Sequence, residues 1–377
     1  MSTEVAAHVC PDCATTVEQW EGQPAPRLYG FAARDVAAAL VMVAGGASYR
    51  ETAEAIRVRA GRPLSTTPGL TPAKVKGKKA KVLPAANRHP QLVSDWVEVF
   101  APMIWAAYAP TIWPAKVAID DRGFRHGTRV GSPRGDRAFS VLASLGYDDA
   151  GRTYVAAIEA VAQSTTAAWK THLGSLQGRP EWVVGDGGHP LKAAAAVWPA
   201  DSQEPAVQTF RCEWHLARNI TQALPTAVER DRDDPLHKLV PAAVRSLAGW
   251  QKLFNLISKR AADGTNYDGV INVLLRIREI VAAHEAIDVT GPRSSGAVEE
   301  FFRQLENTIG DRASRLTNKT RTDALLKLIA CRRNGWVDES DWAELIRENL
   351  AKTNGRPRNQ RSHTDSKSKP GLKAYPR

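Results

Sequence analysis

The sequence predicts a chain of the α/β class, in which an all-helical segment interrupts a strand-containing core and a small helical module precedes it. Three observations carry this prediction. Apolar runs that end in acidic residues recur in the first half of the chain. Residues 216–284 carry apolar residues at helical spacing without a convincing strand, and two short helix patterns flank a Gly-Gly turn near the N-terminus. With 377 residues, the chain is long enough for two or three domains.

The chain is strongly basic, with a formal net charge of +11. Such a charge favours a polyanionic partner, most simply nucleic acid, although a solubility effect would produce the same number. The most apolar segments, Val36–Ala44 and Ala101–Ala115, are too short or too broken by proline to span a membrane. Four cysteines and no recognisable leader predict a cytoplasmic protein.

Residues 1–27 contain the pair Cys10-Pro-Asp-Cys13, which has the spacing of half a zinc site. His8 offers a third ligand, but no second Cys-x-x-Cys pair follows. We therefore interpret this segment as a partial zinc motif, with two unpaired thiols as the alternative.

Residues 28–65 read as two helices around the turn Gly45-Gly46. Ser48 and Glu51 have the spacing of a capping box at the start of the second helix. The exposed side of that helix carries arginines, so the pattern predicts a helix-turn-helix that contacts DNA through Arg50, Arg57 and Arg59. The alternative is an ordinary pair of antiparallel helices.

Two segments are rich in positive charge and poor in apolar residues. Residues 66–90 predict a basic linker, in which Lys76, Lys78 and Lys79 would contact phosphates. Residues 339–377 predict a basic C-terminal tail.

The core is predicted from the order of its elements. An apolar strand over 116–121 precedes strands over 138–146 and 153–162, which the turn 147–151 joins as a hairpin. A helix, a further strand at 182–184 and another helix and strand follow. Three antiparallel strands followed by parallel strands with helical crossovers describe an RNase H-like core. We place it in residues 91–226 and 291–338, with a helical insertion at 227–290.

Three acids occupy the positions where such a core keeps its metal ligands. Asp120 ends the first strand, Asp186 ends a later strand, and Glu299 lies near the start of the helix after the helical block. Oxygen ligands of this kind suit Mg²⁺ or Mn²⁺, and two such ions would serve phosphodiester transfer. Glu299 flanks the apolar stripe of its helix whereas Glu300 points away, so we choose Glu299.

These residues resemble a known pattern: VAIDD at Asp120, VVGDGG at Asp186, RCEWHLARN at Cys212 and His215, and SSGAVE at Glu299. The set resembles the DDE transposases of bacterial insertion sequences, especially the Mutator-like group. The resemblance implies metal-dependent cleavage and strand transfer on double-stranded DNA, at the element ends and the target. It also implies a homodimer or higher oligomer on DNA and association with the nucleoid. Gly296 departs from the pattern, because an Asn is usual before the glutamate.

Cys212 and His215 have several interpretations. They could form a structural pair beside the site, a zinc site completed by Cys10 and Cys13, or a nucleophile with its base. We favour the structural pair. For the whole chain, the alternatives are a catalytically inactive DNA-binding regulator and a structure-selective nuclease on the same fold.

Overall fold

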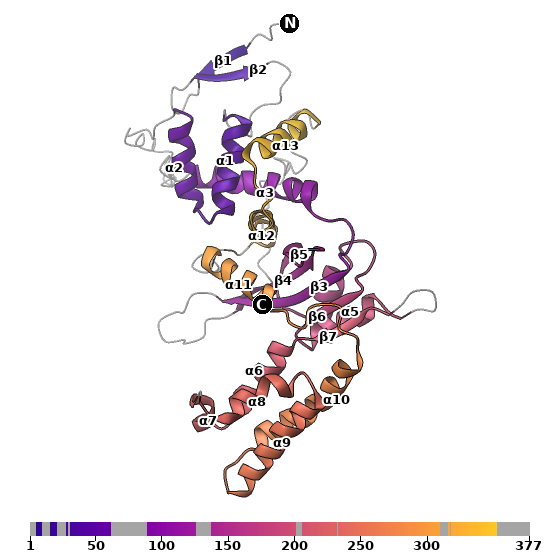
Figure 1. The fold of residues 1–377 in the computed structure, drawn as a ribbon. Helices are drawn as coiled ribbons and strands as arrows, with labels where there is room; N and C mark the ends of the chain where they lie inside the picture. Colours follow the sequence, from indigo (N-terminus) through magenta and orange to yellow (C-terminus); the bar gives the residue numbers. More distant parts are fainter. Residues whose placement is uncertain are drawn as a thin grey trace, which may run out of the picture.

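A five-stranded mixed sheet lies at the centre of the computed structural model, which describes residues 5–9, 16–20, 28, 31–61, 89–125, 137–200, 206–231, 233–309, 316 and 318–352. The strands are β3 (Lys116–Arg125), β4 (Arg137–Tyr147), β5 (Thr153–Val161), β6 (Trp182–Gly185) and β7 (Gln208–Arg211). Their order is β5-β4-β3-β6-β7 (Figure 1). β3 and β5 both pair antiparallel with β4, whereas the pairs β3–β6 and β6–β7 are parallel. The predicted α/β class and the predicted strands are confirmed.

Local sequence explains the hairpin between β4 and β5. The carboxylate of Asp148 accepts the backbone N–H groups of Ala150 and Arg152 at 3.0 and 2.8 Å. Gly151 has φ +75°, a conformation that residues with a side chain rarely adopt. The turn residues thus set the register that the hairpin needs.

Helices cover both faces of the sheet. Alternation along β3 sends Ala118 into the larger hydrophobic core, and Val117 and Ile119 into a smaller one. The larger core lies under α3 (His89–Tyr108), α11 (Gly296–Ile309) and α12 (Lys319–Arg333). The smaller core lies under α4 (Thr166–Leu173) and α5 (His189–Val197).

The two N-terminal helices are α1 (Ala33–Ala44) and α2 (Tyr49–Arg59), and the capping box of Ser48 and Glu51 is present as predicted. They do not stand apart from the core, because Val36, Leu40 and Ile56 belong to the same hydrophobic cluster as α3 and α12. Arg50 is exposed, but Arg59 pairs with Glu339 and lies 3.6 Å from Asp35. The guanidinium of Arg59, predicted to contact DNA, thus joins elements of the chain itself.

Residues 339–352 correct the prediction of a tail from 339 onward. They form α13 (Glu339–Lys352), which packs against α1 and buries Trp342, Ala343 and Ile346. The Asp338 carboxylate accepts the N–H groups of the first turn at 2.7 and 3.0 Å. The prediction rested on the basic residues of 353–377 and extended the tail back to 339, although residues 339–352 carry four acidic and two basic side chains. Residues 353–377 lie outside the described residues, as do Cys10, Cys13, Lys76, Lys78 and Lys79. Near Cys10 and Cys13, the strands β1 (Val5–Val9) and β2 (Thr16–Trp20) form an antiparallel pair.

A second body of helices follows β7. It contains α6 (Glu213–Ala223), α7 (Thr226–Arg230), α8 (Pro235–Ala243), α9 (Leu247–Ala262) and α10 (Asp268–Ala286). These helices share their own hydrophobic cluster and extend from the sheet on the side opposite to α1, α2 and α13 (Figure 1). The cluster begins at Leu216, so α6 shares the core of the helices that follow the predicted boundary at 227. No helix in the described part of the chain is long and apolar enough to cross a membrane.

A compact joint connects the helical unit to the sheet. The ring of His284 in α10 stacks on Phe210 of β7, with centroids 3.6 Å apart, and accepts the backbone N–H of Arg211 at 3.2 Å. Glu213 is buried and pairs with Arg245 at 3.2 Å and with Arg293 at 2.8 Å. These contacts fix the start of α6 relative to the sheet.

The buried His284 predicts that acid weakens the fold. Burial lowers the pKa of His284 to about 4 from 6.5, aided by the charges of Arg293 and Arg211 and opposed by Glu213. Below pH 6.5 the unfolded chain therefore binds a proton at His284 that the folded chain does not bind. The contribution of neutral His284 to the free energy of unfolding is complete above pH 6.5 and is lost as the pH falls towards 4. The gap corresponds to roughly 3 kcal/mol.

The measurement is the free energy of urea unfolding at pH 7.5 and pH 5. We expect the loss between these two pH values to be smaller in His284→Gln than in the wild type, because glutamine keeps an acceptor for the N–H of Arg211 but does not titrate. An equal loss in both proteins would contradict the assignment.

Candidate metal centre

Asp120 lies within β3, just beyond its parallel pairing with β6; the prediction that this acid ends its strand was wrong, because β3 continues to Arg125. Asp120 follows Ile119 in β3, and the Cα register pairs Ile119 with Gly185 at the end of β6. Asp120 has the same strand parity as Ala118 and so faces the larger core and α11. Its side chain is buried, and one carboxylate oxygen accepts the N–H of Asp121 at 2.8 Å. Burial raises the pKa of Asp120 to about 7, against the opposing effect of His215.

Asp186 follows directly after β6, one step beyond the last paired residue. It has the parity of Trp182 and Val184, which face the larger core, and it is half-buried. Its charge helps to raise the pKa of His215. Asp186 therefore lies near the acids, as the sequence predicts, but outside the compact group described below.

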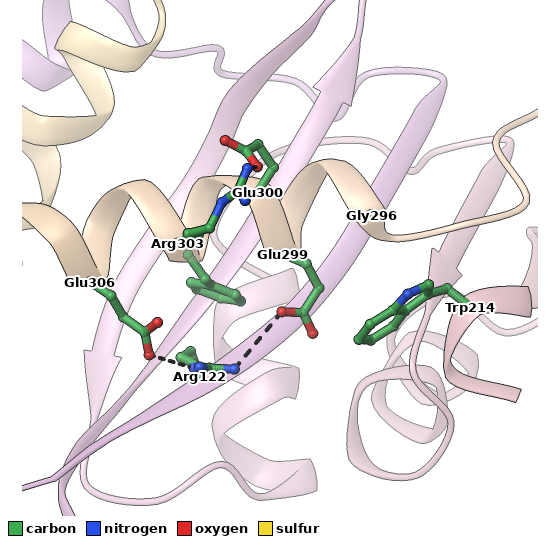
Figure 2. Close-up of a pocket in the computed structure, with 8 residues that line it drawn as sticks. Arg122, Trp214, Gly296, Glu299, Glu300, Arg303 and Glu306 are labelled. Atoms are coloured by element: carbon green, nitrogen blue, oxygen red, sulfur yellow. Dashed lines mark hydrogen bonds and ion pairs between the residues drawn. The ribbon is translucent and has the colours of Figure 1, made fainter. Parts of the chain in front are cut away.

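Glu299 reaches the sheet from the first turns of α11. The buried residues Val298, Phe302 and Leu305 hold this helix against the sheet, and Glu299 flanks them. Glu300 leaves the helix on a different side and pairs with Arg303 (Figure 2). The geometric choice of Glu299 over Glu300 thus agrees with the observed positions.

His215 completes the group and is the residue that the sequence interpretation undervalued. Its Nε2 lies 3.4 Å from a carboxylate oxygen of Glu299 and 3.8 Å from one of Asp120. One ligand atom each from Asp120, His215 and Glu299 lies within 4.8 Å of the other two. These three residues can therefore hold a metal ion. The sequence interpretation placed Cys212 and His215 beside the site as a structural pair. That His215 is a member of the group depends on how α6 is oriented, which the sequence does not show.

The charges of His215 and the neighbouring carboxylates shift one another's pKa values. Burial opposes a charge on His215, yet contacts with Cys212, Glu299 and the nearby aspartates raise the pKa of His215 to about 10. The contact with His215 in turn lowers the pKa of Glu299 despite its partial burial. In the metal-free protein, the imidazolium supplies the positive charge that the carboxylates require. A metal ion would supply that charge instead, and His215 would then bind it as the neutral base.

Ser295 connects the members of the group, and sequence reasoning missed it. This fully buried residue donates its hydroxyl to Asp120 at 3.2 Å and lies 3.5 Å from Nδ1 of His215. Its backbone N–H contacts Sγ of Cys212 at 3.2 Å. Its carbonyl accepts the N–H groups of Val298 and Glu299, so Ser295 also starts α11. A serine four residues before Glu299 was the available signal.

Cys212 is a structural member of this arrangement. It is fully buried, and hydrogen bonds from His215, Ser295 and Ser294 outweigh burial and lower the pKa of Cys212 to about 6. A substrate has no access to this sulfur, so the structure does not favour a cysteine nucleophile. The suggested zinc partners Cys10 and Cys13 lie outside the described residues.

A pocket of about 380 Å³ opens beside Glu299. Arg122 of β3 forms its floor and pairs with Glu306 at 2.8 Å and more loosely with Glu299 at 3.9 Å (Figure 2). Trp214, which precedes His215, forms its opposite wall. The pocket and the acidic group therefore share Glu299.

A second constellation of catalytic type is closed to solvent. Ser144 lies 2.9 Å from His172, whose other ring nitrogen lies 3.3 Å from Glu159. Ser144 and His172 are buried, so these three residues tie α4 to the sheet and offer no nucleophile to a substrate.

Comparison with models of known protein families and with curated proteins finds no match to this chain.

Proposed function

We propose that this chain is a DDE-type transposase that cleaves DNA and joins the cut ends to a target in a metal-dependent reaction. The observation that carries the proposal is the meeting of Asp120, His215 and Glu299 over the central strand β3, with Asp186 just after the end of the neighbouring strand β6. These residues come from positions 120, 186, 215 and 299, and the acids among them are the ones that the motif resemblance selects.

The topology supports an RNase H-like core. Three antiparallel strands are followed by two parallel ones in the order β5-β4-β3-β6-β7, and this arrangement is compatible with the predicted element order. The helical unit lies between the second and third acid in the chain, where the resemblance implies an insertion. Its separate hydrophobic cluster is consistent with that origin.

The ligand set fits a divalent metal ion of the Mg²⁺ or Mn²⁺ class. Carboxylate oxygens of Asp120 and Glu299 are hard donors, and the imidazole of His215 adds a donor that Mn²⁺ accepts more readily than Mg²⁺. Asp186 would serve a second ion. A bound ion of this class activates water and stabilises charge on the reacting phosphate. Zinc at the N-terminus stays a prediction, since Cys10 and Cys13 lie outside the described residues.

The chain's own residues have defined tasks in this proposal. Ser295 orients Asp120 and keeps His215 in line with it. Arg122 lies beside Glu299, where its guanidinium would face a phosphate group. Arg50 on the exposed side of α2 would contact the DNA backbone at a distance from the reacting bond.

The test is a joining assay with DNA ends taken from the sequences that flank the coding region. Labelled oligonucleotides with these ends are incubated with a supercoiled plasmid in Mn²⁺, in Mg²⁺ or in excess chelator. We expect joined products with either ion and none with chelator. Cleavage without joining would instead identify a nuclease, and sequence-specific binding without any metal-dependent product would identify a regulator; either outcome overturns the proposal.

A further inference from the structure

Trp214 is an exposed aromatic residue at the edge of the candidate metal centre. Its side chain is 46% exposed, although most large apolar side chains of the described core are buried. The rings of Trp214 and His215 pack edge to face, with centroids 4.8 Å apart. The guanidinium of Arg218 lies 5.4 Å from the centroid of the Trp214 ring. The neighbouring residue of the metal group and a cation one helical turn away therefore hold the indole in place.

The pocket that Trp214 lines has the size of a nucleotide site and an aromatic wall. Its volume of about 380 Å³ falls in the range of about 300–1,000 Å³ that is usual for small ligands. Phe302 contributes apolar surface. Arg122 and Arg303 also line the pocket, but they pair with Glu306 and Glu300, which line it too. The aromatic wall suits an unpaired base.

The pocket fits an unpaired nucleotide better than a base pair. A base within a duplex has neighbours on both faces and cannot meet an indole ring. A hollow of this volume also cannot admit a double helix, whereas a single nucleotide at a strand end or displaced from the stack can enter. Because Glu299 belongs to both the pocket and the metal group, the nucleotide would lie next to the phosphodiester that reacts (Figure 2).

We propose that Trp214 stacks on an unpaired nucleotide of the DNA strand, in the pocket between α6 and α11, and so places the adjacent phosphate at the metal group. This inference rests on the proposed function for the identity of its ligand as DNA. It assigns a binding role to Trp214, which is not one of the residues that could hold the metal ion.

The test uses two DNA probes of one sequence, a fully paired duplex and the same duplex with three unpaired nucleotides at one 3′ end. The first unpaired base is 2-aminopurine, whose fluorescence falls when it stacks on an aromatic ring. Binding is measured with Ca²⁺ in place of the reactive ions. We expect the full-length protein to bind the probe with the unpaired 3′ end more tightly than the paired duplex. We also expect it to quench the 2-aminopurine fluorescence of that probe.

Trp214→Ala should remove the quenching and weaken binding of the probe with the unpaired 3′ end about 10-fold, since a base–aromatic stack is worth about 1–3 kcal/mol. Its affinity for the paired duplex should not change. Trp214→Phe should keep most of the quenching. Leu275→Ala removes an apolar side chain of similar exposure, 52%, from α10 and should behave as the wild type.

Unchanged quenching in Trp214→Ala, or a wild-type protein that binds both probes equally, would overturn the inference. Its failure is distinguishable from failure of the proposed function. Joined products from a wild type whose quenching does not depend on Trp214 would reject the pocket alone. Quenching that depends on Trp214, without metal-dependent joining, would reject transposition and keep the nucleotide site.

Discussion

Replacement of Glu299 by glutamine is expected to lower metal-dependent DNA joining by at least about 100-fold. The change removes one negative charge and one strong oxygen donor from the group of Asp120, His215 and Glu299. Changes to residues that merely support metal ligands already cost 10–100-fold, so the loss of a ligand sets a higher cost. Initial rates of joining in Mn²⁺, together with Mn²⁺ affinity from calorimetry, measure the effect.

The neighbouring residue offers a matched control. Glu300→Gln removes the same charge from the next position of α11, where the side chain pairs with Arg303 and Gln304 and not with the metal group. We expect joining within about threefold of the wild type, because exposed ion pairs contribute little. Equal losses in both variants would show that the net charge of α11, and not ligation by Glu299, controls the reaction.

Replacement of Trp342 by alanine is expected to destabilise the chain by about 3–5 kcal/mol, the usual cost of removing a buried tryptophan. Trp342 is completely buried, packs α13 into the same core as α1, and donates its indole N–H to the carbonyl of Trp336 at 3.1 Å. The variant therefore loses apolar burial and leaves a carbonyl without its partner. Urea unfolding followed by circular dichroism gives the free energy.

Glu344→Ala is the control on the same helix, because this side chain is exposed. It should change the free energy of unfolding by less than about 0.5 kcal/mol. If Trp342→Ala had an effect as small as this, residues 339–352 would belong to the predicted tail, and the docking of α13 would be wrong.

Local pattern determines much of the fold. Strands and hairpin followed from alternation and turn chemistry, as Asp148 and Gly151 illustrate. The capping box at Ser48 and Glu51 also involves only near neighbours. Boundaries that depend on distant packing were less accurate. The apolar face of α6 is visible in the sequence, but its assignment to the helical unit depends on contacts with α8 and α10.

The sequence by itself determined that Asp120 lies on a strand, that Asp186 follows the end of another, and that Glu299 flanks the apolar stripe of its helix. Strand periodicity and helical geometry carry that information, because both are short-range. The tertiary structure alone decided that His215 joins Asp120 and Glu299, with Ser295 between them, while Asp186 lies just outside the group. The physical reason for this grouping is the placement of α6. Contacts of Glu213 with Arg293 and of Cys212 with Ser295, each between residues about eighty positions apart in the chain, fix that placement.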